Sequence, residues 1–163
     1  MEIDAYRIAA LVTGAGNSVA TEATKSNAYE VFLQMQEKLD EDKAPVGGRI
    51  ALVTPAYYNK LKLDSSFVKA SEIGQRMLLN GQVGEVDGVP IIKVPSSYFP
   101  VGVSSLITNP IAAPSPIKLQ DFKIHDNPPG INGFLIEGRV RYDCFVLTNK
   151  ADAIVYNGTV AST

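Results

Sequence analysis

The sequence contains few of the side chains that carry nucleophilic and metal chemistry. Its 163 residues include one cysteine and one histidine. A lone cysteine cannot form a disulfide within the chain, and Cys144 lies in an apolar alternation that is typical of a small buried residue. Structural zinc sites need clusters of cysteine and histidine, and a catalytic triad needs a base beside its nucleophile. We therefore expect no catalytic residue, no cofactor and no metal.

Two polar groups that invite a catalytic or metal-binding interpretation have simpler ones. His125 ends a predicted strand before a Pro-Pro turn, and no G-x-S-x-G nucleophile elbow accompanies it. Asp40-Glu41-Asp42 lacks the ligand spacing and the glycine turn of a calcium-binding loop. We interpret His125 as a surface residue and the acidic triplet as a solvated helix end.

An excess of charge of one sign and long apolar runs are also missing. The chain has 15 basic and 17 acidic residues, a net charge of -2, whereas domains that bind nucleic acid tightly cluster Lys and Arg on one face. No apolar run approaches the roughly 20 residues that span a bilayer, and the N-terminus has no signal-peptide pattern. We expect no membrane partner and only indirect contact with DNA.

What remains is the composition of an ordinary globular chain, 45% hydrophobic and 20% charged, whose first half is predicted to be mainly helical. Apolar residues at helical spacing predict helices over the first dozen residues and from Asn27 to Lys43, where Asn27 and Glu30 would form a capping box. The Gly- and Ser-rich stretch between them is expected to be a loop. Further expected elements are a buried strand at 49–54, a helix at 56–63 begun by Thr54-Pro55, and a helix at 71–80.

From residue 82 onward the apolar period changes to two, which indicates strands. Asp87-Gly88 predicts a two-residue hairpin turn, because both turn positions need positive φ. Helices around a sheet followed mainly by strands predict the α+β class. The expected strands lie at 106–109, 117–125, 134–147 and 153–156, with a polar tail at 157–163.

The longest of these strands, at 134–147, has a charged face with two interpretations. Glu137, Arg139, Arg141 and Asp143 alternate along it. They are either an ordinary solvated strand face or a candidate subunit interface. In the second case opposite charges pair with a neighbouring copy and set its register.

Residues 11–18, Leu-Val-Thr-Gly-Ala-Gly-Asn-Ser, resemble the nucleotide-binding opening of short-chain dehydrogenases, and Tyr58 with Lys62 reproduces a Y-x-x-x-K spacing. However, Ser18 and Ala20 occupy the last two positions at which that motif needs glycine for the approach to a pyrophosphate. The two motifs are also too close together for the βαβ units of a cofactor site. A nucleotide-binding oxidoreductase is therefore a remote alternative.

Five segments share the order and spacing of one known family. They are Glu2–Arg7, Arg49–Tyr58, Asn80–Ile92, His125–Gly133 and Glu137–Asp143. Together they resemble the major capsid proteins of tailed bacteriophages and prophages, which have the Hong Kong 97-type fold. The resemblance implies an axial domain plus part of a peripheral domain, without the N-terminal arm and the extended loop.

The same resemblance implies a division of the chain. Residues 1–26 would be the end of the spine helix and a connecting loop of the peripheral domain, and 27–112 the axial domain. Residues 113–148 would form the peripheral-domain sheet, and 149–163 the final axial strand and a tail.

By resemblance the function is structural, and the partners are copies of the same chain. They would assemble as pentamers and hexamers into an icosahedral head in the bacterial host cytoplasm, with a scaffolding protein and a portal as further partners. The alternative within the same fold is an encapsulin-like nanocompartment shell, which houses a cargo enzyme in place of DNA.

Overall fold

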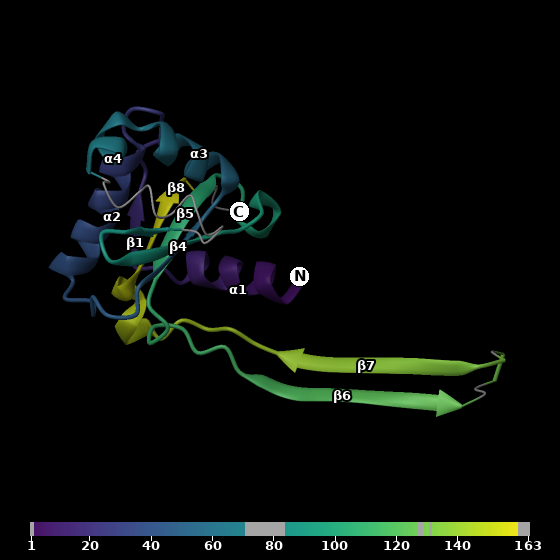
Figure 1. Ribbon diagram of the computed structural model, residues 1–163. Coiled ribbons are helices and arrows are strands. Elements are labelled where there is room, and N and C mark those ends of the chain that lie inside the picture. The colour runs from purple at the N-terminus through teal and green to yellow at the C-terminus, as the bar shows by residue number, and fades with distance from the viewer. Residues whose placement is uncertain (1, 71–83, 127–128, 131, 160–163) are drawn as a thin grey trace.

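The computed structural model, which describes residues 2–70, 84–126, 129–130 and 132–159, has a body built on a six-stranded sheet and a hairpin that projects from it (Figure 1). The strand order in the body is β1-β8-β5-β2-β4-β3. Its helices are α1 (Glu2–Thr13), α2 (Ala28–Glu41), α3 (Pro55–Leu63) and α4 (Ser65–Ala70), with 3-10 turns η1 (Ser96–Tyr98) and η2 (Thr148–Ala153). Its strands are β1 (Asn17–Val19), β2 (Ile50–Val53), β3 (Glu85–Val86), β4 (Val89–Lys93), β5 (Val103–Thr108) and β8 (Ile154–Gly158), and the hairpin is β6 (Ile117–Asp126) and β7 (Phe134–Tyr142).

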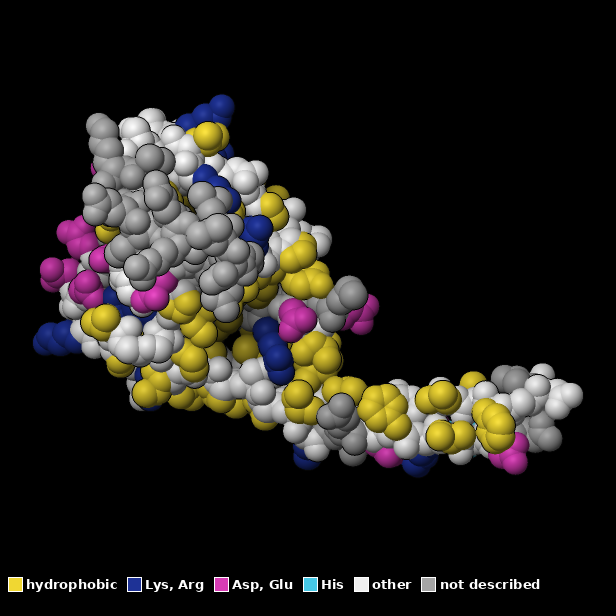
Figure 2. Space-filling view, viewed as in Figure 1, with side chains coloured by type: hydrophobic (Ala, Val, Ile, Leu, Met, Phe, Trp, Pro, Cys, Tyr) yellow, Lys and Arg dark blue, Asp and Glu magenta, His cyan; other side chains and the backbone are white. Residues whose placement is uncertain are grey.

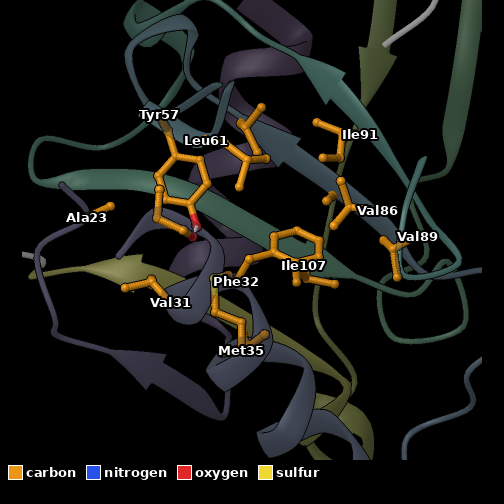
Figure 3. Close-up of a cluster of buried hydrophobic side chains, with 14 of the residues drawn as sticks. Ala23, Val31, Phe32, Met35, Tyr57, Leu61, Val86, Val89, Ile91 and Ile107 are labelled. Atoms are coloured by element: carbon orange, nitrogen blue, oxygen red, sulfur yellow. Dashed lines mark hydrogen bonds between the residues drawn. The ribbon is translucent and has the colours of Figure 1, made fainter. Parts of the chain in front are cut away.

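Each face of the sheet carries its own hydrophobic cluster. Successive side chains of a strand point to opposite faces, and in β5 Leu106 joins the cluster that includes α1 while Ile107 joins the cluster of α2 and α3. Figure 3 shows this second cluster, in which Phe32 and Met35 of α2 and Tyr57 of α3 pack together with residues of the sheet. The predicted apolar stripe of α2 is confirmed, because all of its members are buried: Ala28, Val31, Phe32, Met35 and Leu39.

The predicted start of α3 is confirmed and the predicted capping box of α2 is wrong. Thr54 Oγ1 accepts a hydrogen bond from the backbone N–H of Tyr57 at 3.3 Å, and Pro55 opens the helix. Asn27 does precede α2, but its side chain makes no cap, and its Oδ1 accepts from Thr24 in the preceding loop instead. Its backbone, with ψ at 6°, lies outside the extended region that an N-cap residue needs to aim its side chain at the first turn.

Some predicted boundaries differ from the structure. The loop expected at 13–25 contains β1, which is too short to show a period of two and forms because it pairs in parallel with β8. Strand β7 ends at Tyr142 and not at Leu147, since the segment opposite contains Pro114 and Pro116, which have no N–H for a regular ladder. The helix expected at 71–80 lies outside the described residues.

The Asp87-Gly88 hairpin is confirmed, and both turn residues have positive φ, 52° and 76°. The polar tail, by contrast, is predicted to begin at residue 157, which is too early, because β8 continues to Gly158. Asn157 belongs to β8 and is buried; its Nδ2 donates to the carbonyl oxygens of Val19 and Thr21, and its Oδ1 accepts from Ser104 Oγ at 2.6 Å. This one amide therefore links β1, β5 and β8 where β1 and β8 end and β5 begins.

Next to Asn157, the chain around Gly102 and the chain at Gly158 and Thr159 approach so closely that neither glycine has room for a side chain. Gly158 has φ of 135°, and a Cβ there would overlap the carbonyl oxygen of Gly102. We expect Gly158→Ala to lower the free energy of unfolding by at least about 2 kcal/mol, from backbone strain and overlap together. Urea denaturation measures this, with Gly47→Ala as the control. At Gly47 the added methyl meets open space, so the change should stay within about 0.5 kcal/mol; equal effects of the two substitutions would contradict this account.

Candidate assembly surface

Strands β6 and β7 form a two-stranded antiparallel sheet that extends away from the body (Figure 1). Ile124 lies opposite Ile136, and Phe122 lies opposite Gly138. A strand rises about 3.3 Å per residue, so the ten residues of β6 reach roughly 30 Å. A two-stranded hairpin is marginally stable by itself in water, and a hairpin of this length therefore favours a partner surface.

One face of the hairpin is apolar and exposed to solvent. Phe122, Ile124, Phe134 and Ile136 are 65%, 71%, 75% and 69% exposed. The ring of Phe122 lies over Gly138, and a Cβ added at Gly138 would be only 3.0 Å from a ring carbon. The absence of a side chain at Gly138 therefore leaves room for the ring. Figure 2 shows a row of hydrophobic side chains along the hairpin. Contiguous exposed apolar surface of this kind marks an interaction site.

The opposite face carries the predicted charges, and several of them pair within the hairpin. Glu137 accepts a hydrogen bond from His125 Nε2 at 3.0 Å and lies 3.6 Å from the guanidinium of Arg139. The hydrogen bond from His125, helped by the charge of Arg139, holds the pKa of Glu137 below its usual range. Across the part of the chain that the structure describes, Arg141 has no ion pair. His125 is 44% exposed, as expected for a surface residue.

Asp143 does not share this face, because β7 ends one residue before it. Its Oδ1 accepts from the hydroxyl of Tyr6 on α1 at 2.9 Å and from the backbone N–H of Cys144 at 2.8 Å. The Tyr6 ring meets the Tyr142 ring edge to face, with centroids 5.6 Å apart. The hydrogen bond to Asp143 raises the pKa of Tyr6. Tyr6, Tyr142 and Asp143 together anchor the root of the hairpin to α1, a role that the alternating pattern did not indicate.

Cys144 is buried beside this anchor, as predicted, and burial raises the pKa of its thiol. Asp40 of the acidic triplet forms an ion pair with the buried guanidinium of Arg49 at 2.7 Å, so the triplet is not merely a solvated helix end. Within the described ranges, His, Cys, Asp and Glu side chains form no group of three or more that could hold a metal ion. No described helix is both long and apolar enough to cross a membrane.

The nucleotide-binding interpretation of residues 11–18 has no support in the geometry. A dinucleotide-binding glycine loop follows a strand, whereas here the glycines follow α1. Gly14 packs against Val146, and Gly16 packs against Ala151 and Asp152, so both serve close contacts between segments. Lys62 places its ammonium 4.7 Å from the ring centre of Tyr58, on the outer side of α3.

Comparison with known proteins identifies the fold. No protein-family model matches the sequence, and no curated protein sequence matches it. Among solved structures, a chain of Mycobacterium phage Che8 is 15% identical with a TM-score of 0.73, covering 95% of this chain and 55% of that one. A chain of the capsid of cyanophage P-SCSP1u is 16% identical with a TM-score of 0.71, covering 98% and 60%. A virus-like particle from Pyrococcus furiosus gives 15% and 0.58, covering 96% and 63%.

The chain therefore has the α+β fold of phage major capsid proteins, and the predicted Hong Kong 97-type fold is confirmed. It spans a little over half the length of the phage chains that it matches. The division into axial and peripheral domains stays a prediction.

The anchor at the hairpin root predicts that Asp143 sets the direction of the hairpin. Asp143→Ala removes the acceptor of the Tyr6 hydrogen bond, which at this exposed position contributes about 1 kcal/mol. We expect the body to stay folded and the distance distribution between spin labels at Lys25 and His125 to broaden. Asp121→Ala is the control, because that carboxylate makes only a long, exposed ion pair of 3.9 Å. An unchanged distribution in Asp143→Ala would show that the anchor does not orient the hairpin.

Proposed function

We propose that the protein is the major capsid subunit of a tailed double-stranded DNA bacteriophage or prophage, and that it assembles with copies of itself into an icosahedral head. The observation that carries this proposal is the apolar face of the β6–β7 hairpin, which the rest of the described chain leaves exposed. The fold shared with phage capsid chains supports the same conclusion. The proposed role is structural and non-enzymatic.

The energetics favour burial of this face by a neighbouring subunit. Burying a Phe or Ile side chain stabilises by roughly 1.5–3 kcal/mol, and the face presents four such side chains. The contribution recurs at every copy of a repeated interface, so contacts that are weak one at a time hold a closed shell together. A projecting hairpin also reaches beyond the outline of its own body, which suits it to overlap an adjacent copy.

The proposed partners are copies of the chain arranged as pentamers and hexamers, with a scaffolding protein and a portal as further candidates. The net charge of -2 supports only indirect contact with packaged DNA. The proposed location is the virion capsid, after assembly in the host cytoplasm. In this scheme the body of residues 27–112 with β8 is the axial domain. The hairpin at 113–148 and α1 in 1–26 belong to the peripheral domain, and 149–163 return to the axial domain.

A second candidate is an encapsulin-like nanocompartment shell. The likeness to the virus-like particle from Pyrococcus furiosus favours it, but with a TM-score of 0.58 against 0.73 and 0.71 for the first two phage chains. Genes next to the coding sequence distinguish the two: a portal, terminase or prohead protease indicates a phage, and a peroxidase or ferritin-like cargo indicates a nanocompartment.

Substituting the apolar face tests the proposal directly. Ile124 and Ile136 face each other across the strands, and replacing both by Thr keeps the β-branched shape while removing apolar surface. We expect normal melting of the body and a loss of closed particles in electron microscopy of the complete protein. Val46→Thr, at a 67% exposed valine on the body, is the matched control. Particles formed by the Ile124→Thr, Ile136→Thr double variant at the wild-type yield would contradict the proposal.

The charged face gives a second test of the candidate interface. Arg141→Glu reverses a charge that has no partner within the described hairpin, so the folded subunit should change by less than about 0.5 kcal/mol. If Arg141 meets acidic groups of a neighbouring copy, the variant assembles poorly and recovers in part at high salt, where repulsion is screened. Arg139→Glu is a less specific test, because it also removes the ion pair with Glu137 and places a second carboxylate beside it within the same subunit. Wild-type particle yields from Arg141→Glu would leave this face as an ordinary solvated surface.

A further inference from the structure

An open groove of about 720 Å³ runs between α2 and β1 at one edge of the sheet. Its wall on the α2 side carries Glu37 and Glu41, one helical turn apart on the exposed side of the helix, and Asp42 follows at the helix end. Like charges at this spacing repel each other. In the described structure neither glutamate has an ion pair. Lys38 also lines the groove, where its ammonium donates to the carbonyl oxygen of Ser18 at 2.6 Å. The lining therefore carries three carboxylates, those of Glu37, Glu41 and Asp42, and one ammonium, so the groove is net acidic.

The opposite arrangement lies toward the other edge of the same sheet. Lys62 of α3 and Lys93 at the end of β4 hold their ammonium groups 4.7 Å and 5.1 Å from the ring centre of the same residue, Tyr58. Both lysines are exposed, and no described carboxylate forms an ion pair with either. Two ammonium groups that converge on one ring repel each other unless an anion joins them. This basic cluster is defined by Tyr58, Lys62 and Lys93.

The two features lie toward opposite edges of one sheet. The groove borders β1, the first strand in the order, and Lys93 belongs to β4, the fifth. Strands are spaced about 4.8 Å apart, so roughly 19 Å of sheet separates the two strands. In Figure 2, acidic side chains gather on the left flank with some basic side chains among them, and further basic side chains lie at the top and centre of the body.

We propose that the basic cluster of one copy docks into the acidic groove of the next. Complementary patches at opposite edges produce a head-to-tail contact that repeats in one direction, and such a contact forms a ring when the rotation between copies closes. The lysines bring two positive charges to Glu37 and Glu41, and such pairing steers association and fixes its register. This inference rests on the proposed shell function and names a contact within its rings, separate from the hairpin surface.

A second copy fits the observations better than a nucleic acid does. A phosphate backbone would use the lysines and leave the acidic groove without a partner, whereas a neighbouring copy satisfies both features at once. The groove and the cluster also border one and the same sheet, so the strands between them set their separation.

Charge exchange between two variants of the complete protein tests the contact. Variant A carries Glu37→Lys and Glu41→Lys, and variant B carries Lys62→Glu and Lys93→Glu. Alone, each places like charges at every ring contact, and we expect its association, followed by native mass spectrometry and electron microscopy, to weaken by at least about tenfold. Mixed together, A and B restore the pairing in alternating, even-numbered rings. A single chain with all four substitutions restores self-association, and Lys25→Glu, an exposed lysine outside both features, is the control.

Three results would overturn the inference. The first is wild-type association of A and of B, with normal particles from the same preparations, which leaves the proposed shell function standing. The second is a loss in A and B that neither mixing nor the four-substitution chain repairs, while thermal melts confirm folded subunits. The third is association of the wild type that a nuclease abolishes, which assigns the lysines to nucleic acid. If the wild type forms no particles under any assembly condition, the shell function fails together with this contact.

Discussion

The pairing of β5 with β8 is the constraint on which the rest of the architecture depends. These strands are hydrogen-bonded neighbours, yet residues 109–153 separate them in the sequence. Because β5 ends where β8 begins, the intervening segment leaves and re-enters the sheet at one point, and its two halves are brought side by side as β6 and β7. The buried amide of Asn157 and the close approach of Gly102 to Gly158 hold the far end of the same pair.

This arrangement separates two physical roles within one chain. The body buries its apolar residues in two clusters, one on each face of the sheet. The hairpin has no second layer, so its apolar face stays in solvent and its charged face pairs partly with itself. In a protein divided in this way, contact between the hairpin and another subunit buries apolar surface and lowers the free energy of the assembly. The anchor of Tyr6 and Asp143 then matters because it fixes where that surface points.

The hairpin contact and the head-to-tail contact place different demands on the chain. The first relies on apolar area along an extended hairpin, and the second on opposite charges toward two edges of one sheet. Apolar burial supplies affinity without direction, and charge pairing supplies register. A shell whose copies must meet at repeated angles requires both.

The elements with a local signal could be predicted from the sequence alone. The apolar stripe of α2, the Thr54-Pro55 start of α3 and the Asp87-Gly88 turn follow from spacing and turn chemistry within a few residues, and the order of segments indicated the fold. Only the tertiary structure decided which strands pair and which residues meet across the chain. Asn157, expected in the polar tail, is buried and links three strands. Asp143, expected on the charged strand face, binds Tyr6 in the anchor. The three-residue strand β1 forms because it pairs with β8. Each of these depends on a contact between segments more than 130 positions apart, and a pattern read along the chain contains no information about such distances.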